Sequence, residues 1–272
     1  MQKLIVLSIF VNMAKFKEWV GPVYLEPIEH KYHHRETGKI YKSVTTTLVS
    51  IEPHFDAEAV SLAISKQPDK AKQEVYIGMS QQQILDYWQM LNDEANIYGT
   101  KVHNIMENYL LANKWYFPED NEEGQFEQKV IDAYNELKID EGQAGWPERI
   151  MFSEQYELAG TADLIYDIDD VYFDVGDFKT NKVFNFFNPY GYETLLKPFD
   201  HLQACHWSIY TLQLSVYAYM YELEFPRRKC RQIYILFWDK ETKKFQKIQV
   251  MYLKKEAKQL IEMHHYNIMK NL

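Results

Sequence analysis

The chain has 272 residues, 46% hydrophobic and 15% aromatic, which is enough to bury a sizeable core and too apolar for a disordered protein. Its formal net charge of −9 argues against a protein that holds nucleic acid by charge alone, and its 2 cysteines exclude a disulfide framework. No stretch is rich in Gly, Pro or Ser and none repeats, so we expect a single domain over residues 1–272.

The first apolar stretch, residues 4–11, is too short to span a bilayer and lacks a convincing small-residue cleavage site. Met13 offers an alternative start, so the first twelve residues are expected to be an optional strand or tail. A short signal peptide is the other interpretation. Together with the two cysteines, this stretch predicts a cytoplasmic protein with no membrane contact.

Residues 30–45 are expected to form a β-hairpin that leads into a helix, with Ser43 or Thr45 as the helix cap. Residues 56–145 are predicted to be mostly helical. This helical region is expected to be an addition within the same domain, and it leads into a central sheet formed by the strands that follow. Within this region, Asn121 is expected to cap an amphipathic helix.

A long helix is predicted over residues 83–113, where apolar residues recur at helical spacing. His103 and Glu107 are four residues apart and therefore stack on one face of this helix. An imidazole and a carboxylate at such positions can supply a metal ligand and a supporting or proton-transfer group. The same pair also fits an ordinary solvated helix face.

A strand pattern follows the helical region. Residues 152–159 lead to Gly160, where two short strands are expected to meet because glycine permits a bend or a close approach. Asp163 enters the second of these strands. The acidic cluster at residues 167–170 then predicts a turn into a further strand.

That further strand ends at Asp177 and Lys179. Side chains alternate along a strand, so Asp177 and Lys179 point the same way and Phe178 points into the core. Asp163 and Asp177 would lie on adjacent strands and could share a metal ion. A carboxylate beside an ammonium group suits phosphodiester cleavage, although each acid also fits a solvated edge position.

The charges are strongly segregated along the chain. Residues 119–174 carry seventeen acids and three bases, whereas residues 227–258 carry eleven bases and three acids. The basic segment is predicted to form two strands joined near residues 239–242, followed by a C-terminal helix over residues 254–270. Its interleaved aromatic residues fit phosphate contacts and base stacking, or equally a solvated face over a core.

Four motifs occur in a fixed order: GxxxHxxxE from Gly99, GxxD from Gly160, DxK from Asp177 and QxxxY from Gln213. Over roughly residues 98–217, this series resembles the RecB-type, phage exonuclease-like branch of the PD-(D/E)XK nuclease superfamily. The resemblance implies an α/β fold with a restriction-endonuclease-like core, in which a mixed central sheet is flanked by helices. The sheet core and the QxxxY helix would span about residues 149–250. The hairpin and Ser-Val-Thr helix start near residue 43 are similar to what precedes these motifs in phage-type members.

The same resemblance implies a nuclease that hydrolyses DNA with Mg²⁺ or Mn²⁺. It implies a metal site of His103, Asp163, Asp177 and Phe178. The implied catalytic residues are Lys179, Asp177, Asp163, Glu107 and Gln213. The implied substrate-binding residues are Thr180, Tyr217, Lys182, Arg227, Arg228, Lys243 and Lys244.

Some relatives bind an iron–sulfur cluster through four cysteines, but Cys205 and Cys230 are too few for one. Trp207, just before the QxxxY motif, is expected in the core.

The resemblance suggests exonucleolytic processing of DNA ends in recombination or repair, in a phage-encoded protein acting in the host cytoplasm. A helicase or a single-strand annealing protein is a candidate partner. Two alternatives remain open: a structure-specific endonuclease of the same fold, and a non-catalytic protein that binds or assembles on DNA ends. The sequence does not specify the polarity of digestion, the preference for single or double strands, the oligomeric state, or the choice between DNA and RNA.

Overall fold

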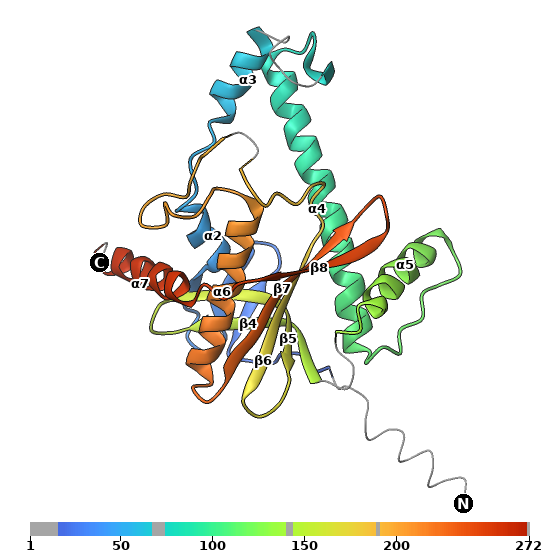
Figure 1. Ribbon diagram of the computed structural model, residues 1–272, viewed down its shortest axis with the longest axis vertical. Coiled ribbons are helices and arrows are strands. Elements are labelled where there is room, and N and C mark those ends of the chain that lie inside the picture. The colour runs from blue at the N-terminus through green and yellow to red at the C-terminus, as the bar shows by residue number, and fades with distance from the viewer. Residues whose placement is uncertain (1–15, 67–73, 140–143, 189–190, 271–272) are drawn as a thin grey trace, which may run out of the picture.

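The computed structural model describes residues 16–66, 74–139, 144–188 and 191–270, so the prediction for the first twelve residues lies outside the described part. The strands form one mixed sheet in the order β1-β2-β3-β5-β6-β7-β8, and β4 also pairs with β5 (Figure 1). The pairs β3–β5 and β6–β7 are parallel and the others are antiparallel. The predicted mixed central sheet with flanking helices is therefore confirmed.

The strands are β1 (Val23–Glu26), β2 (Lys31–His34), β3 (Ile40–Ser43), β4 (Ala144–Ser153), β5 (Leu158–Asp167), β6 (Tyr172–Lys179), β7 (Lys229–Asp239) and β8 (Lys244–Val250). The helices are α2 (Val44–Val49), α3 (Ala57–Lys66), η3 (Glu74–Tyr76), α4 (Gln81–Leu111), α5 (Glu122–Glu136), α6 (His206–Glu224) and α7 (Lys254–Lys270). None of the helices in the described ranges has the length and apolar character needed to cross a membrane.

Local sequence signals account for the helix starts. Ser43 caps α2, and its side chain accepts a hydrogen bond of 3.0 Å from the backbone N–H of Thr46, so the expected cap is Ser43 rather than Thr45. Asn121 caps α5 in the same way through Gly124. The long helix α4 begins at a capping box formed by Ser80 and Gln83. The predicted helical region is thereby confirmed.

The sheet separates two hydrophobic cores because side chains alternate along its strands. Ile233, Ile235 and Phe237 of β7 lie in a core that includes buried residues of α6 and α7. The alternate β7 residues, Tyr234, Leu236 and Trp238, lie in a second core with buried residues of α4 and α5. The helices thus cover both faces of the sheet, as Figure 1 shows, whereas α3 and the start of α4 project beyond it.

The predicted meeting of two strands at Gly160 is wrong. The turn lies at residues 154–157, where Glu157 adopts a φ of 50°, and Gly160 sits inside the ten-residue strand β5. Gly160 instead permits a close approach. A Cβ at this position would lie 2.6 Å from Tyr217 Cε1 and 3.0 Å from Val44 Cγ2.

Replacing Gly160 with alanine is expected to lower the free energy of unfolding by about 1–3 kcal/mol, because the added methyl group overpacks a buried site. Tyr217 and Val44 are both buried, so neither can swing into solvent to make room. Urea unfolding of the variant and the wild type measures the difference. An unchanged urea midpoint would show that the core accommodates the methyl group without cost.

Candidate active site

Two buried aspartates lie side by side on the strands β5 and β6. Leu164 pairs with Gly176 across these antiparallel strands, and Asp163 precedes Leu164 while Asp177 follows Gly176, so the two aspartates lie next to each other. Both carboxylates are buried. Burial and the neighbouring charge of Asp163 raise the pKa of Asp177 to about 6, although Lys179 opposes the shift. Burial, with a smaller contribution from Glu148, also raises the pKa of Asp163.

Lys179 is paired with Asp177, as the alternation along β6 predicts, while Phe178 is buried. The Lys179 ammonium also lies 4.8 Å from the centre of the Tyr210 ring, whose hydroxyl donates a 2.9 Å hydrogen bond to Asn181 Oδ1. Burial alone lowers the pKa of Lys179, but Asp177 and Asp163 outweigh it and raise the pKa. Lys179 is therefore a cation in this site rather than a proton acceptor.

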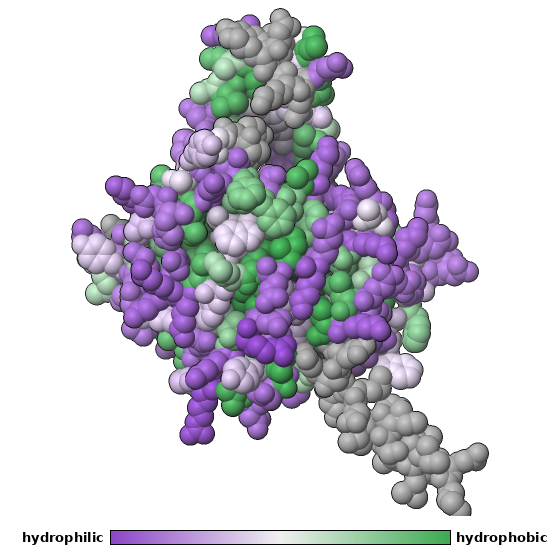
Figure 2. All heavy atoms as spheres, in the orientation of Figure 1, coloured by the Kyte–Doolittle hydropathy of each residue, from purple (hydrophilic) through white to green (hydrophobic). Residues whose placement is uncertain are grey.

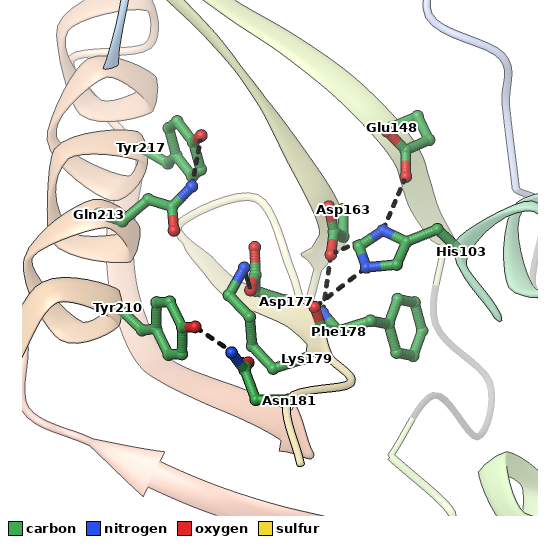
Figure 3. A network of polar contacts seen from close by, with 10 residues as sticks. All are labelled: His103, Glu148, Asp163, Asp177, Phe178, Lys179, Asn181, Tyr210, Gln213 and Tyr217. Carbon is green, nitrogen blue, oxygen red and sulfur yellow. Dashed lines mark hydrogen bonds and ion pairs between the residues drawn. The ribbon is translucent and has the colours of Figure 1, made fainter. Parts of the chain in front are cut away.

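His103 of α4 lies beside Asp163, on the opposite side of the two aspartates from Lys179 (Figure 3). Its Nδ1 atom lies 3.4 Å from Asp163 Oδ2 and 3.9 Å from Glu148 Oε1, and its Nε2 atom lies 3.1 Å from the Phe178 carbonyl oxygen. A hydrogen bond from Nε2–H to this carbonyl leaves Nδ1 facing the acids, so Nδ1 carries a proton in the imidazolium form and offers its lone pair to a cation once that proton has left. Burial lowers the pKa of His103, but Asp163 and Glu148 outweigh it and raise the pKa to about 9.

Glu148 is the site residue that the sequence analysis missed. It lies on β4 with a φ of 47°, and its neighbours Pro147 and Arg149 pair with Leu164 and Ala162, so Glu148 lies opposite Asp163. A non-glycine residue with positive φ inside a strand is uncommon and concentrates at functional sites. The sequence signal was the Pro-Glu-Arg run within an otherwise apolar strand, because proline inside a strand indicates an irregularity.

His103, Glu148 and Asp163 together form a candidate metal centre, since one ligand atom from each lies within 4.8 Å of the others. Two carboxylate oxygens and one imidazole nitrogen suit Mn²⁺, and they suit Mg²⁺ where water completes the shell. Asp177 lies outside this group of three and pairs with Lys179. The Phe178 side chain packs in the core, and its carbonyl oxygen is the atom that faces His103.

Glu107 lines the cleft beside the site. A cavity of about 720 Å³ lies along α4 and is lined by His103, Glu107, Glu148, Lys179 and Thr180, among others. Burial and the charges of Glu18 and Asp163 raise the pKa of Glu107. Glu107 is therefore positioned to meet a molecule in the cleft.

Gln213 and Tyr217 of α6 face each other, and Gln213 Nε2 donates a 3.0 Å hydrogen bond to the Tyr217 hydroxyl. Tyr217 is only 2% exposed and packs beside Gly160, so its position suits support of the site rather than substrate contact.

The predicted substrate-binding residues divide between the two ends of the sheet. Lys182 is exposed shortly after Lys179, and Lys243 and Lys244 lie where β7 turns into β8, at the same end as the site. Arg227 and Arg228 precede β7, which begins beside Tyr172. Lys179 lies seven steps after Tyr172 along β6, which corresponds to roughly 23 Å. Arg228 is moreover paired with Asp167.

Metal affinity is expected to rise with pH between 7 and 9, because the proton on His103 must leave before its Nδ1 atom can bind a cation. With a pKa of about 9 for His103, each pH unit below that value costs roughly tenfold in affinity. Calorimetric titration with Mn²⁺ across this range measures the slope. His103→Gln should bind more weakly and with a flat profile, and a flat wild-type profile would contradict a role for His103 as ligand.

These residues define a class of protein: one with a mixed α/β fold and a candidate metal centre of one histidine and two acids. A crystal structure of a protein from Eubacterium rectale, named as a proposed exonuclease, matches 86% of this chain and 81% of its own, with 15% identity and a TM-score of 0.43. At these values the likeness adds nothing to the argument from the site. No family model matches the sequence, and no curated protein matches it.

Proposed function

We propose that this protein is a divalent-metal-dependent DNA nuclease of the PD-(D/E)XK type, acting as an exonuclease at DNA ends. The observation that carries the proposal is the His103, Glu148 and Asp163 cluster beside the buried Asp177–Lys179 pair, where the end of β6 lies next to the middle of β5. The motif order in the sequence supports it independently. His103, Glu148 and Lys179 line one cleft, and the buried Asp163 and Asp177 contact His103 and Lys179 respectively.

His103, Glu148 and Asp163 would hold the cation, with Asp177 close by. When bound, a divalent cation supplies Lewis-acid chemistry, which stabilises charge on a phosphodiester and lowers the pKa of water. The Lys179 ammonium stabilises negative charge that gathers on phosphate oxygens in the transition state. Asp177 and the Tyr210 ring hold that ammonium in place. The N–H of Phe178 donates a 2.7 Å hydrogen bond to Asp163 Oδ2 and orients this carboxylate.

The acidic composition is compatible with this function because two acids of the acidic segment belong to the site. Glu148 and Asp163 lie within residues 119–174, and a bound cation offsets the repulsion between these two acids and phosphate. The cleft wall on α4 offers uncharged hydrogen-bonding groups, including Asn92, Asn96 and Thr100. These can contact a polynucleotide without adding charge.

The test compares degradation of end-labelled linear DNA with degradation of covalently closed circular DNA, in Mn²⁺, in Mg²⁺ and in chelator. Lys179→Ala serves as the matched variant. Loss of linear DNA alone, dependent on metal and on Lys179, is the expected result. Cutting of the circle would make the protein an endonuclease, and retention of DNA without cleavage by well-folded protein would make it a DNA-end-binding protein.

We further propose a role in recombination or repair, in a phage-encoded protein of the host cytoplasm, with a helicase or single-strand annealing protein as partner. This part rests on the motif resemblance alone. A pull-down from infected host cells, with and without nuclease treatment, tests for a partner that binds the protein directly.

A further inference from the structure

The segment that follows Lys179 builds an aromatic pocket near the candidate active site. Phe186 and Phe187 are 49% and 74% exposed, although large apolar side chains are costly to leave in water. With Leu202, Gln203 and Trp207 they line a cavity of about 360 Å³. Figure 2 shows apolar side chains gathered on this face, where the segment meets the start of α6. Trp207, expected in the core, is half-buried and lines this pocket.

Hydrogen bonds to the start of α6 hold the pocket in shape. The Trp207 N–H donates to the Asn185 carbonyl oxygen at 3.0 Å, and Asn188 Nδ2 donates to the Ala204 carbonyl oxygen at 3.0 Å. The Gln203 side-chain oxygen accepts a 3.1 Å hydrogen bond from the Asn188 N–H. The exposed rings are therefore displayed on a tethered scaffold, which lowers the entropy cost of binding a ligand.

A series of ring contacts joins this pocket to the catalytic lysine. The Phe184 ring lies 4.9 Å from the Phe186 ring and 6.2 Å from the Tyr210 ring. Tyr210 in turn lies against the Lys179 ammonium at 4.8 Å. Trp207 precedes Tyr210 by three residues, about one helical turn on α6. A DNA strand whose phosphodiester lies at Lys179 can therefore reach the pocket within a few nucleotides.

The local charge also permits a polyanion. Beyond Lys179, which is paired with Asp177, residues 180–210 carry two lysines and two acids and are therefore neutral, in a chain with a net charge of −9. Aromatic faces combined with basic groups are the features that bind single-stranded nucleic acid, where each base stacks on a ring. In a duplex the base faces are covered by their neighbours, so a stacking pocket selects unpaired nucleotides.

We infer that the pocket of Phe186, Phe187 and Trp207 binds a nucleobase of an unpaired DNA strand whose scissile phosphodiester lies at Lys179. This inference rests on the proposed nuclease function and narrows its substrate to DNA with single-stranded nucleotides near the cleavage site. Phe187, the more exposed of the two phenylalanines, offers the stacking face.

The test is a double-mutant cycle between protein and DNA, read as binding rather than cleavage. Fluorescence anisotropy measures the affinity of Lys179→Ala protein, with Mg²⁺, for a labelled 12-nucleotide single strand of thymidines and for copies with one abasic position. Adding Phe187→Ala is expected to weaken binding of the intact strand about 5- to 150-fold, the equivalent of one stacked base. In the Lys179→Ala parent, one abasic position in the strand should weaken binding by a similar factor. In the protein that also carries Phe187→Ala, the same abasic position should not weaken binding further.

Phe117→Ala, which removes a 77% exposed phenylalanine from the link between α4 and α5, is the matched control and should bind DNA as the parent does. Trp207→Leu should reproduce the loss caused by Phe187→Ala. Unchanged DNA affinity in Phe187→Ala would overturn the inference and would favour a protein partner as the ligand of the pocket. The inference would also be overturned if Phe187→Ala and each abasic position weakened DNA binding by factors that simply multiply when the two changes are combined. Degradation of DNA by the wild type, measured separately, tells whether the proposed function stands in either case.

Discussion

Replacing Lys179 with methionine is expected to lower the rate of DNA cleavage about 10²- to 10³-fold, the loss typical of removing one group that stabilises transition-state charge. Methionine occupies a similar volume without the ammonium. Lys179 lies outside the cluster of candidate ligands, so Mn²⁺ affinity should change little. Initial rates on end-labelled linear DNA at saturating Mn²⁺ measure the effect.

The same variant should be less stable, because it leaves the buried Asp177 carboxylate without its cation. Removing one partner of a buried pair typically costs about 3–5 kcal/mol. Adding Asp177→Asn should recover most of the free energy of unfolding but none of the activity. This outcome would separate the catalytic effect of Lys179 from its effect on folding.

The matched control is Lys258→Met, which removes an exposed lysine from α7 and should affect neither rate nor stability. If Lys179→Met cleaved DNA at the wild-type rate, Lys179 would be only a structural partner of Asp177. If Lys258→Met lost as much activity, the loss would reflect total charge instead of a specific site.

Replacing Glu148 with glutamine is expected to weaken Mn²⁺ binding by at least about 100-fold, the upper end of the loss seen for a supporting group around a metal. The variant keeps the size of the side chain and removes the charge that faces His103 and Asp163. Cleavage should fall in parallel when the metal is subsaturating. Calorimetric titration with Mn²⁺ measures the affinity.

Without metal, Glu148→Gln should unfold at the same temperature as the wild type or higher. Glu148 and Asp163 face each other on adjacent strands, where like charges are destabilising. His103 still pairs with Asp163 in the variant. Added Mn²⁺ should raise the unfolding temperature of the wild type much more than that of the variant.

Glu154→Gln is the matched control for this experiment, because Glu154 lies in the turn that ends the same strand and its side chain is 70% exposed. It should bind Mn²⁺ as the wild type does. Wild-type affinity in Glu148→Gln would remove Glu148 from the metal centre and leave Asp177 as the next acid to test.

Local patterns in the sequence determined the secondary structure and half of the site. The apolar spacing in α4 fixed which face is buried, and therefore placed His103 and Glu107 at the edge of that face. Alternation along β6 paired Asp177 with Lys179 and buried Phe178. These predictions succeeded because helix and strand periodicity depends on neighbours within a few residues.

Only the tertiary structure decided which acids meet and which bases lie near them. Glu148 joins the site because β4 pairs with β5, a contact with no local signature beyond an irregular Pro-Glu-Arg run. Arg227 and Arg228 carry the right charge, but the parallel pairing of β6 and β7 places them at the far end of the sheet from Lys179. Gly160 serves a contact with Tyr217, more than fifty residues away. Strand pairing and register set these relations, and they depend on the packing of the whole chain rather than on any single segment.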